Sequence, residues 1–383
     1  MKPKENVINS YNNNDEMNTH KINNNISVNT NRNKVLNFRI ENPSLKIDKI
    51  LKKESNTENK ENIEKNMNLT TRERRKFRLD KYSNSNTSEQ TLVVKNQQKH
   101  KKEKIIYFDI SKIPDNVQIP KEYMNKIYLN LLKEEEAGVT PKARYNYMKE
   151  QKEINQQMRS ILIDWLIDVH YKFGFTDETL FMTVSIIDRY LSVNQISRLK
   201  LQLLGITALL IACKHEEIDL PKIGDFTYIT DNAYVKDEVI QMENDVLKVL
   251  NFSLLYPSPI KFYEYLSVNF GFDKKMHLMG KYLMESFLVD IKHIKYKPSI
   301  ISSACIYIVM KFFKKKNYQE SYDNKFYSLI TDENAKYTEH DVKDCAKDIC
   351  LFVDNISKTK FLSCQKKYAK PELEKVSIII MNN

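Results

Sequence analysis

Apolar side chains recur every three to four residues over most of the chain beyond residue 119, which is the period of an amphipathic α-helix. In the first such segment, Tyr123, Ile127 and Leu131 form one narrow apolar stripe. Two later segments, 199–215 and 299–313, are apolar on nearly every side, which is typical of helices at the centre of a bundle. The pattern predicts ten helices: 120–136, 157–173, 177–192, 199–215, 221–226, 236–250, 259–270, 274–291, 299–313 and 338–357.

Pro257 and Pro259 interrupt this pattern and divide the helices into two groups. Each group has an apolar helix at its centre, and Asp177 is expected as the N-cap of the helix that follows it in the first group. We therefore predict an all-α protein in which two tandem five-helix bundles follow an N-terminal tail. The predicted parts are a tail at 1–104, a first bundle with its preceding helix at 105–257, a second bundle at 258–375 and a short tail at 376–383.

The first 104 residues have a different composition. They contain roughly 22 Asn and few aromatic residues, without a sustained apolar period. The chain carries 61 Lys and Arg against 50 Asp and Glu, a net charge of +11, and roughly +10 of this charge lies in the tail. Such a segment cannot bury enough apolar surface to offset its loss of entropy, so we predict that it is disordered. Its basic clusters, 72–76 (RERRK) and 99–104 (KHKKEK), fit nuclear import and plain solvated charge equally well.

Several classes of function are disfavoured by what the chain lacks. Its six glycines are dispersed, so no glycine-rich loop is available to hold a nucleotide, as a Rossmann enzyme or a P-loop protein would need. The five Cys and seven His include no Cys-x-x-Cys or His-x-x-x-His pair, so we expect reduced thiols, no metal and no cofactor. The N-terminus has no apolar core of a signal peptide, and the apolar runs are too short to span a bilayer, so no membrane contact is expected. No nucleophile–base pair indicates an enzyme.

The segment 157–173 has two apolar faces. Most such faces belong to the core, but a helix with two of them either lies deep inside or offers one face to a partner. One of these faces consists of Met158, Ile161, Leu162 and Trp165, at i, i+3, i+4 and i+7.

A family resemblance is carried by this segment and those that follow it. MRSILIDWL, ETLFMTVSIIDRYLS, KLQLLGITALLIACKHEEI, YITDNAY and QMENDVLKVLNFSLLYPSP resemble, in order and spacing, the N-terminal cyclin box of A/B-type mitotic cyclins over about residues 145–260. A weaker likeness to the C-terminal cyclin fold covers 261–375, through KPSIISSACIYI and KKYAKPELEKVS. The resemblance implies a non-catalytic subunit that binds and activates a cyclin-dependent Ser/Thr kinase as a heterodimer, at the G2/M stage.

The resemblance also assigns kinase contacts residue by residue. Lys214 and Glu243 match the Lys and Glu through which cyclins contact the kinase, although either alone reads as an ordinary exposed charge. His215 stands where the family usually has Phe or Tyr, and its side chain is smaller than either. The remaining expected contacts are Glu217, Ile218, Tyr123 and Ile127.

A second surface implied by the resemblance captures Arg-x-Leu motifs of substrates or inhibitors. In this sequence it comprises Met158, Ile161, Leu162, Trp165, Leu201 and Gln202. Asp168 is expected to receive the basic residue of the motif, where family members often have Glu. Arg159 and Asp188 match a buried ion pair of the family, which we assign to structure and not to binding.

The tail contains two copies of a short degradation signal that mitotic regulators present to a ubiquitin ligase. Roughly 0.3 copies are expected by chance in a segment of this composition, and no Arg-x-x-Leu destruction box accompanies them. The copies are Lys4, Glu5, Asn6 and Lys60, Glu61, Asn62.

Two alternatives use the same fold: a general transcription initiation factor and a transcription-related cyclin. The first would need basic fold surfaces and an N-terminal zinc ribbon, whereas the fold is nearly neutral and the tail has no Cys, so no nucleic-acid partner is expected. Transcriptional cyclins usually lack the MRxILxDWL pattern. We expect the protein in the nucleus and the cytoplasm.

Overall fold

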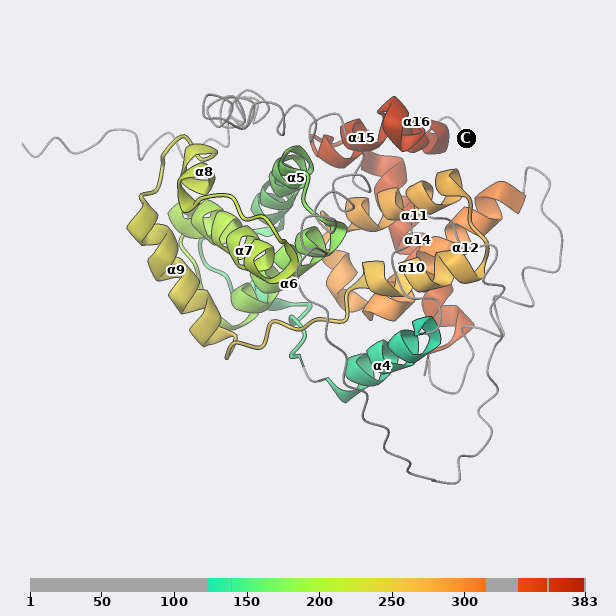
Figure 1. The fold of residues 1–383 in the computed structure, drawn as a ribbon, viewed down its shortest axis with the longest axis horizontal. Coiled ribbons are helices and arrows are strands. Elements are labelled where there is room, and N and C mark those ends of the chain that lie inside the picture. The colour runs from blue at the N-terminus through green and yellow to red at the C-terminus, as the bar shows by residue number, and fades with distance from the viewer. Residues whose placement is uncertain (1–122, 139, 315–336, 357, 382–383) are drawn as a thin grey trace, which may run out of the picture.

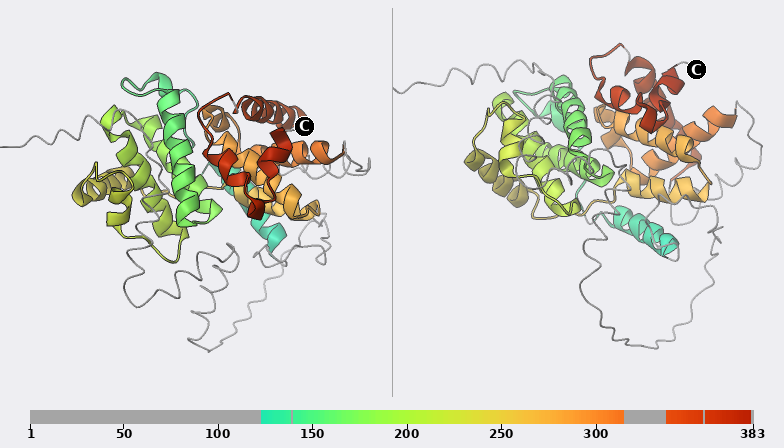
Figure 2. Two further views of the ribbon diagram at one scale, coloured as in Figure 1. Left: turned by 90° about the horizontal axis from the view of Figure 1, so that it is seen from above. Right: turned by 45° about the horizontal axis from the view of Figure 1, so that its top comes forward.

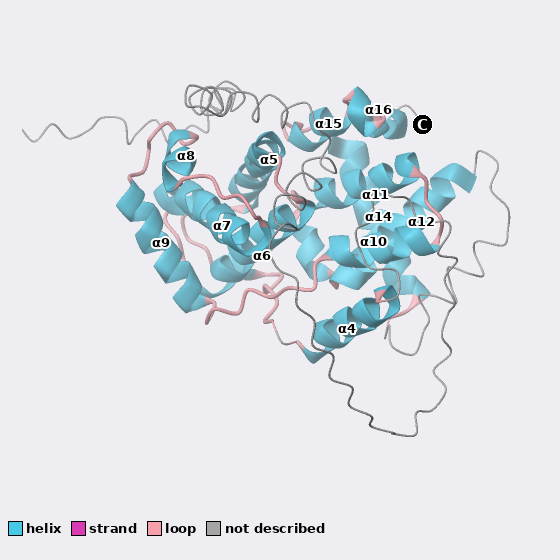
Figure 3. Ribbon diagram, viewed as in Figure 1, coloured by secondary structure: helices cyan, strands magenta, loops and turns pink. Residues whose placement is uncertain are grey.

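A computed structural model of the chain describes residues 123–138, 140–314, 337–356 and 358–381. Within these ranges all regular elements are helices, joined by loops, and no strand occurs (Figure 3). The prediction of an all-α protein is therefore confirmed. The expected tail at 1–104, with its basic clusters and degradation signals, lies outside the described residues.

The first domain is built around a buried central helix. Its helices are α5 (Gln156–Phe173), α6 (Asp177–Val193), α7 (Leu201–Glu216), α8 (Ile223–Tyr228) and α9 (Lys236–Val249). From Leu201 to Cys213, all residues of α7 except Gln202 are buried, and α5, α6, α8 and α9 pack around them (Figure 1). Gly205 allows α5 to cross closely, because a Cβ there would lie only 2.7 Å from Cδ1 of Leu162.

The second domain repeats this plan. Its helices are α10 (Pro259–Asn269), α11 (Lys274–Phe287), α12 (Pro298–Lys314) and α14 (Glu339–Ile356), with the strongly apolar α12 packed against the other three. The two domains lie side by side, so the prediction of a tandem helical fold is confirmed (Figure 1). Most of the polar segment between α12 and α14 lies outside the described residues.

Several predicted boundaries differ from the structure. Asp177 does not cap α6: the N-cap is Thr176, and Asp177 instead accepts a hydrogen bond from Lys281 of α11. Helix α11 ends at Phe287, before the predicted 291, and a 3-10 turn over Ile291–Lys295 follows it.

The C-terminal part contains two helices that the sequence pattern did not predict. They are α15 (Ser363–Tyr368) and α16 (Val376–Met381), and α16 occupies most of the expected short tail at 376–383. Val376 and Ser377 are buried, and α16 packs on α11 and α15. Each helix has six residues, fewer than two turns, which is too short for an apolar period to be visible in the sequence.

Helix α4 (Met124–Ala137) precedes the first domain in sequence but packs on the second, against α10 (Figures 1 and 2). Of the apolar stripe of Tyr123, Ile127 and Leu131, only Leu131 is buried, whereas Tyr123 and Ile127 are exposed. The buried face lies one residue further along, because α4 docks through an aromatic contact that the pattern does not reveal. The buried residues of α4 are Met124, Tyr128, Leu131, Leu132 and Glu135.

Contacts at both ends of α4 hold it on the second domain. The Tyr128 ring stacks on Tyr265 of α10, with centroids 4.1 Å apart. At the other end of α4, the Glu135 carboxylate accepts hydrogen bonds from Ser299 at the start of α12, from the backbone N–H at 2.9 Å and the hydroxyl at 2.5 Å. Burial raises the pKa of Glu135 from its usual value, although these hydrogen bonds oppose the effect.

Candidate functional site

Lys214 and Glu243 meet on the surface of the first domain. Lys214 lies in the last turn of α7 and Glu243 in the middle of α9, and the packing of these helices places Nζ of Lys214 2.5 Å from Oε1 of Glu243. The Lys214 side chain is 44% exposed and that of Glu243 13%. The structure thus brings together the two charges that the resemblance singles out, in a position that a partner can reach.

Of the predicted kinase contacts that follow Lys214, some are accessible and one has a role inside the fold. Ile218 is 51% exposed, and His215 is partly exposed with Nδ1 3.1 Å from the Glu216 carboxylate. Glu217 turns inward: its Oε1 accepts hydrogen bonds from the N–H and hydroxyl of Thr176 and from the hydroxyl of Thr179, at 2.6, 3.0 and 2.6 Å. This oxygen accepts hydrogen bonds from donors at the N-terminus of α6, so Glu217 has a structural role that the sequence did not indicate.

The segment after α9 presents two large apolar residues that the sequence analysis missed. Phe252 is 69% exposed and Leu255 is 68% exposed. The backbone holds them there: Phe252 has a left-handed φ of 55°, and Nη2 of Arg189 donates to the Ser253 carbonyl at 2.7 Å. A signal was available in the sequence, since these residues lie after the last helical period and before Pro257, where no core face requires them.

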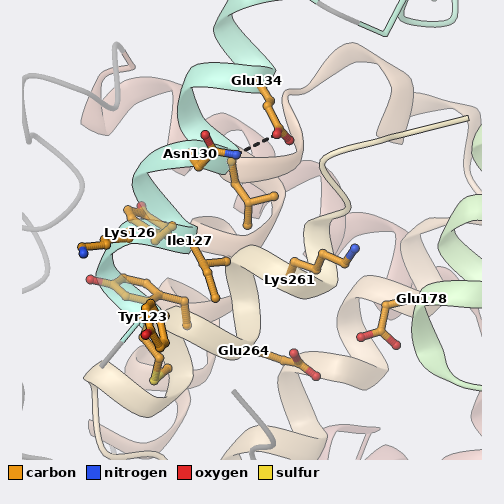
Figure 4. A pocket seen from close by; sticks show the side chains of 12 residues that line it. Tyr123, Lys126, Ile127, Asn130, Glu134, Glu178, Lys261 and Glu264 are labelled. Atoms are coloured by element: carbon orange, nitrogen blue, oxygen red, sulfur yellow. Dashed lines mark hydrogen bonds between the residues drawn. The ribbon is translucent and has the colours of Figure 1, made fainter. Parts of the chain in front are cut away.

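Tyr123, the residue before α4, and Ile127 on α4 form a second exposed pair, 52% and 39% exposed. They line a groove of about 630 Å³ between α4 and α10, which Glu178 at the start of α6 also borders (Figure 4). Its other lining residues are Met124, Lys126, Tyr128, Asn130, Leu131, Glu134, Lys261, Glu264 and Tyr265. The lining therefore combines apolar with charged side chains, a mixture that is typical of surfaces that contact a partner.

The apolar face of α5 is only partly accessible. Met158, Ile161 and Gln202 are partly exposed, whereas Trp165 is 4% exposed. Leu162 and Leu201 are completely buried, so the expectation that they contact a peptide is not met by this structure. We call the accessible part, Met158, Ile161 and Gln202, the α5 patch, and Trp165 is buried beside it.

The core role of Leu162 and Leu201 has a clear cause. Leu162 fills the close crossing of α5 and α7 at Gly205, and Leu201 is the first residue of the central helix α7. The helical spacing could not separate Leu162 from the partly exposed Met158 and Ile161, because spacing shows which residues share an apolar face and not how deeply each is buried.

Arg159 and Asp188 form a buried, doubly hydrogen-bonded ion pair. Nε and Nη2 of Arg159 lie 2.6 and 2.8 Å from the two carboxylate oxygens of Asp188. The hydroxyl of Tyr147 donates to Asp188 at 2.7 Å, and Nε2 of His293 lies 3.3 Å from it. We call these four residues the Asp188 cluster. Burial by itself would raise the pKa of Asp188, but the Arg159 charge and the hydrogen bonds from Arg159 and His293 hold it well below its usual range.

The Asp188 cluster also joins the two domains. Nη1 of Arg159 donates to the carbonyls of Leu288 and Val289, at the end of α11, at 3.0 and 3.3 Å. His293 belongs to the 3-10 turn of the second domain. The Arg159 guanidinium thus connects α5, α6 and the second domain. The sequence led us to expect only the pair with Asp188, which lies within the first domain.

No cluster of His, Cys, Asp or Glu able to hold a metal ion occurs among the described residues. In the same part of the chain, no helix combines the length and the apolar character needed to cross a membrane.

Both domains match known domain families. Residues 126–255 match the cyclin N-terminal domain and residues 257–382 the cyclin C-terminal domain. The chain therefore belongs to the cyclin family. An X-ray structure of a viral cyclin from herpesvirus saimiri has a TM-score of 0.48 with it at 20% sequence identity, covering 59% of this chain and 97% of that chain.

Within the family, the chain resembles mitotic B-type members. A G2/mitotic-specific cyclin-B2 of Oryzias latipes is 38% identical over 271 residues, 69% of this chain and 66% of that protein. A G2/mitotic-specific cyclin-B of Marthasterias glacialis is 40% identical over 265 residues, 69% of this chain and 65% of that protein. The chain thus spans slightly less than two thirds of the length of these relatives.

Proposed function

We propose that this protein is a non-catalytic regulatory subunit that binds a cyclin-dependent Ser/Thr kinase as a heterodimer and activates it during mitosis, at the G2/M stage. The observation that carries this proposal is the accessible Lys214–Glu243 pair on a rigid helical surface, in a chain similar to G2/mitotic-specific cyclins. A transcription-related cyclin is not favoured, because the similar curated proteins are mitotic.

The surface suits an activator of this kind physically. A kinase is active only when its Lys–Glu ion pair and its activation loop are both in place, and a partner that binds this state preferentially shifts the population toward it. Ile218 and Phe252 offer exposed apolar anchors on the same domain as Lys214 and Glu243, and such anchors supply most of the affinity of an interface. Tyr123 and Ile127 add a further apolar contact from α4.

The α5 patch supports recruitment of substrates or inhibitors through short peptides with an apolar anchor, the class to which Arg-x-Leu motifs belong. Met158 and Ile161 offer accessible apolar atoms, and the Gln202 amide can bond a peptide backbone. Gln202 lies in the first turn of α7 and Lys214 in its last turn, about 18 Å apart along the helix, so a peptide docked on the patch does not compete with a kinase bound at Lys214 and Glu243.

The tail is proposed to control lifetime and location. Its two Lys-Glu-Asn triplets would present the chain to a ubiquitin ligase, and its basic clusters would support transport between cytoplasm and nucleus. Removal of the triplets should then prolong the lifetime of the protein through mitosis without changing kinase activation in vitro.

The kinase proposal is tested by mixing the purified chain with cyclin-dependent kinases of the same organism and measuring histone phosphorylation. Lys214→Ala with Glu243→Ala should reduce activation at least about tenfold, since loss of interface hot spots costs about 2 kcal/mol or more. The matched control removes another exposed ion pair, Glu339 and Lys343 of α14. Undiminished activation by the Lys214/Glu243 variant, or equal loss in the control, would refute the assignment.

A further inference from the structure

Glu217 is the residue at which helix α7 ends. It is the C-cap, with extended backbone angles, and its N–H donates to the Cys213 carbonyl at 2.9 Å. Lys214 of the proposed kinase site lies three residues before it, and the exposed Ile218 follows it directly. We call residues 214–218 the contact segment. The place at which Glu217 is held therefore sets how the accessible side chains of this segment are presented.

The Glu217 carboxylate stands at an unfavourable place for α7 itself. The C-terminal end of a helix carries partial negative charge, so bases are favoured there and acids are not. The side chain turns instead to the start of α6, where N–H groups without partners in the helix carry partial positive charge. The acid at the end of α7 thus serves a different helix.

The contact supplies the cap that α6 lacks within its own sequence. Thr176 is the N-cap residue, but its side chain makes no capping hydrogen bond to the backbone of α6. In a capping box, a Glu at the third helical position accepts the N–H of the N-cap residue. Thr179 holds this third position in α6, and Oε1 of Glu217 accepts the Thr176 N–H in its place, together with both threonine hydroxyls.

The first turn of α6 is a rigid anchor for this contact. Thr176 is 8% exposed and Thr179 is completely buried. Nε2 of His170 on α5 lies 2.7 Å from the Thr176 carbonyl, and the Lys281 ammonium of α11 donates to Asp177. Elements of both domains thus hold this turn. A side chain bonded to it has a defined position before any partner binds.

We propose that Glu217 is a positioning residue for kinase binding, whose bonds to the first turn of α6 hold the contact segment in the conformation that the kinase recognises. This inference rests on the proposed function of the Lys214–Glu243 pair. Without these bonds the contact segment populates other conformations, and the apparent dissociation constant rises as the competent fraction falls. The maximal rate does not change, because the complex that finally forms is the same.

Thr179 allows a test that leaves the surface intact. Its side chain is completely buried, so it cannot touch a kinase, and its hydroxyl donates to Glu217 at 2.6 Å. Thr179→Val removes this hydroxyl and keeps the branched shape of the side chain. The matched control is Thr183→Val, one turn later on α6. The Thr183 hydroxyl is equally buried but donates to a carbonyl of its own helix, that of Thr179, at 2.6 Å.

The assay titrates the full-length chain against a fixed concentration of the cyclin-dependent kinase that it activates and records histone phosphorylation. Each variant then has a half-maximal concentration and a plateau rate. Thr179→Val and Glu217→Ala should each raise the half-maximal concentration at least about fivefold and leave the plateau unchanged. Thr183→Val should behave as the wild type. Glu217→Gln retains an oxygen that accepts hydrogen bonds and should recover most of the loss.

Two further measurements identify the route of the effect. In the double variant, Thr179→Val should add less than about twofold to the effect of Glu217→Ala, because both changes break the same contact. Hydrogen exchange of the contact-segment amides in the free chain should accelerate in both single variants and not in Thr183→Val. If Glu217→Ala does not fold, Thr179→Val and Glu217→Gln provide the comparison.

The inference is overturned if the wild type activates a kinase and Thr179→Val keeps the wild-type half-maximal concentration. Equal weakening by Thr183→Val would overturn it too, since the effect would then be a general loss of stability. A lower plateau at an unchanged half-maximal concentration, or exchange of the contact segment unchanged in Thr179→Val, would also contradict positioning. If the wild type activates no kinase, the proposed function fails and this inference fails with it.

Discussion

Replacing Asp188 by Ala tests the energetic role of the Asp188 cluster. The substitution removes the acceptor of two hydrogen bonds from Arg159 and one from Tyr147. The Arg159 side chain is completely buried, so its charge would lose its counter-charge in a place that water does not reach. We expect a loss of about 3–5 kcal/mol in the free energy of unfolding from the orphaned charge, and about 1–3 kcal/mol more from the Tyr147 hydroxyl.

The chain offers a convenient reporter and a matched control. Trp165 is its single tryptophan, is 4% exposed and lies on α5, the helix that carries Arg159, so its fluorescence follows urea unfolding of this region. Asp168→Ala removes an acid from the same helix, but one in a partly exposed ion pair, and should cost at most about 1 kcal/mol. Asp188→Asn keeps the shape of the side chain and serves if the Ala variant does not fold.

The pH dependence supplies a second reading of the same cluster. Because the pKa of Asp188 is lower in the folded than in the unfolded chain, its stabilisation is complete above the unfolded value, near pH 4, and is lost as pH falls below it. The urea midpoint of the wild type should therefore drop more steeply than that of Asp188→Asn between about pH 5 and pH 3. The reasoning would be refuted if Asp188→Ala cost no more than Asp168→Ala, or if Asp188→Asn kept the full acid sensitivity.

Two other substitutions test the packing. Gly280→Ala should lower the free energy of unfolding by about 1–3 kcal/mol, because a Cβ there would lie 2.0 Å from the Tyr263 hydroxyl. The control, Gly224→Ala, places a Cβ where no atom lies within 4 Å and should leave the melting temperature unchanged in the same thermal melt. Glu135→Ala leaves the Ser299 N–H and hydroxyl without their acceptor, so hydrogen exchange of the α4 amides should accelerate. Exchange of the α7 amides should stay unchanged, and equal acceleration in both helices would contradict a local role of Glu135.

The helices that carry the core were predictable because their apolar periods are long. Helices α6, α7 and α12 were expected within two residues of their observed ends, and α7 was correctly identified as a buried central helix. Helix α8 was expected two residues too early, since a helix of six residues has too few positions to define its ends. The same shortness hid α15 and α16.

The functional surface was predictable only where the resemblance named residues. Spacing along a helix gives a face but not its depth, so Leu162 and Leu201 could not be separated from the accessible Met158. The inward role of Glu217 depends on Thr176 and Thr179, which approach from another helix. Long-range contacts of this kind arise from packing, and no local pattern encodes them.

The docking of α4 on the second domain has a consequence for synthesis of the protein. Glu135 and its partner Ser299 are 164 residues apart, so the ribosome needs on the order of ten to thirty seconds after making α4 before it has made the residues that hold it. The first domain is translated within that interval and can close without α4. A nascent chain arrested before α10 therefore displays the apolar side of α4, including Met124 and Tyr128, to cellular chaperones. Burial of that helix marks a chain in which the second domain has been made.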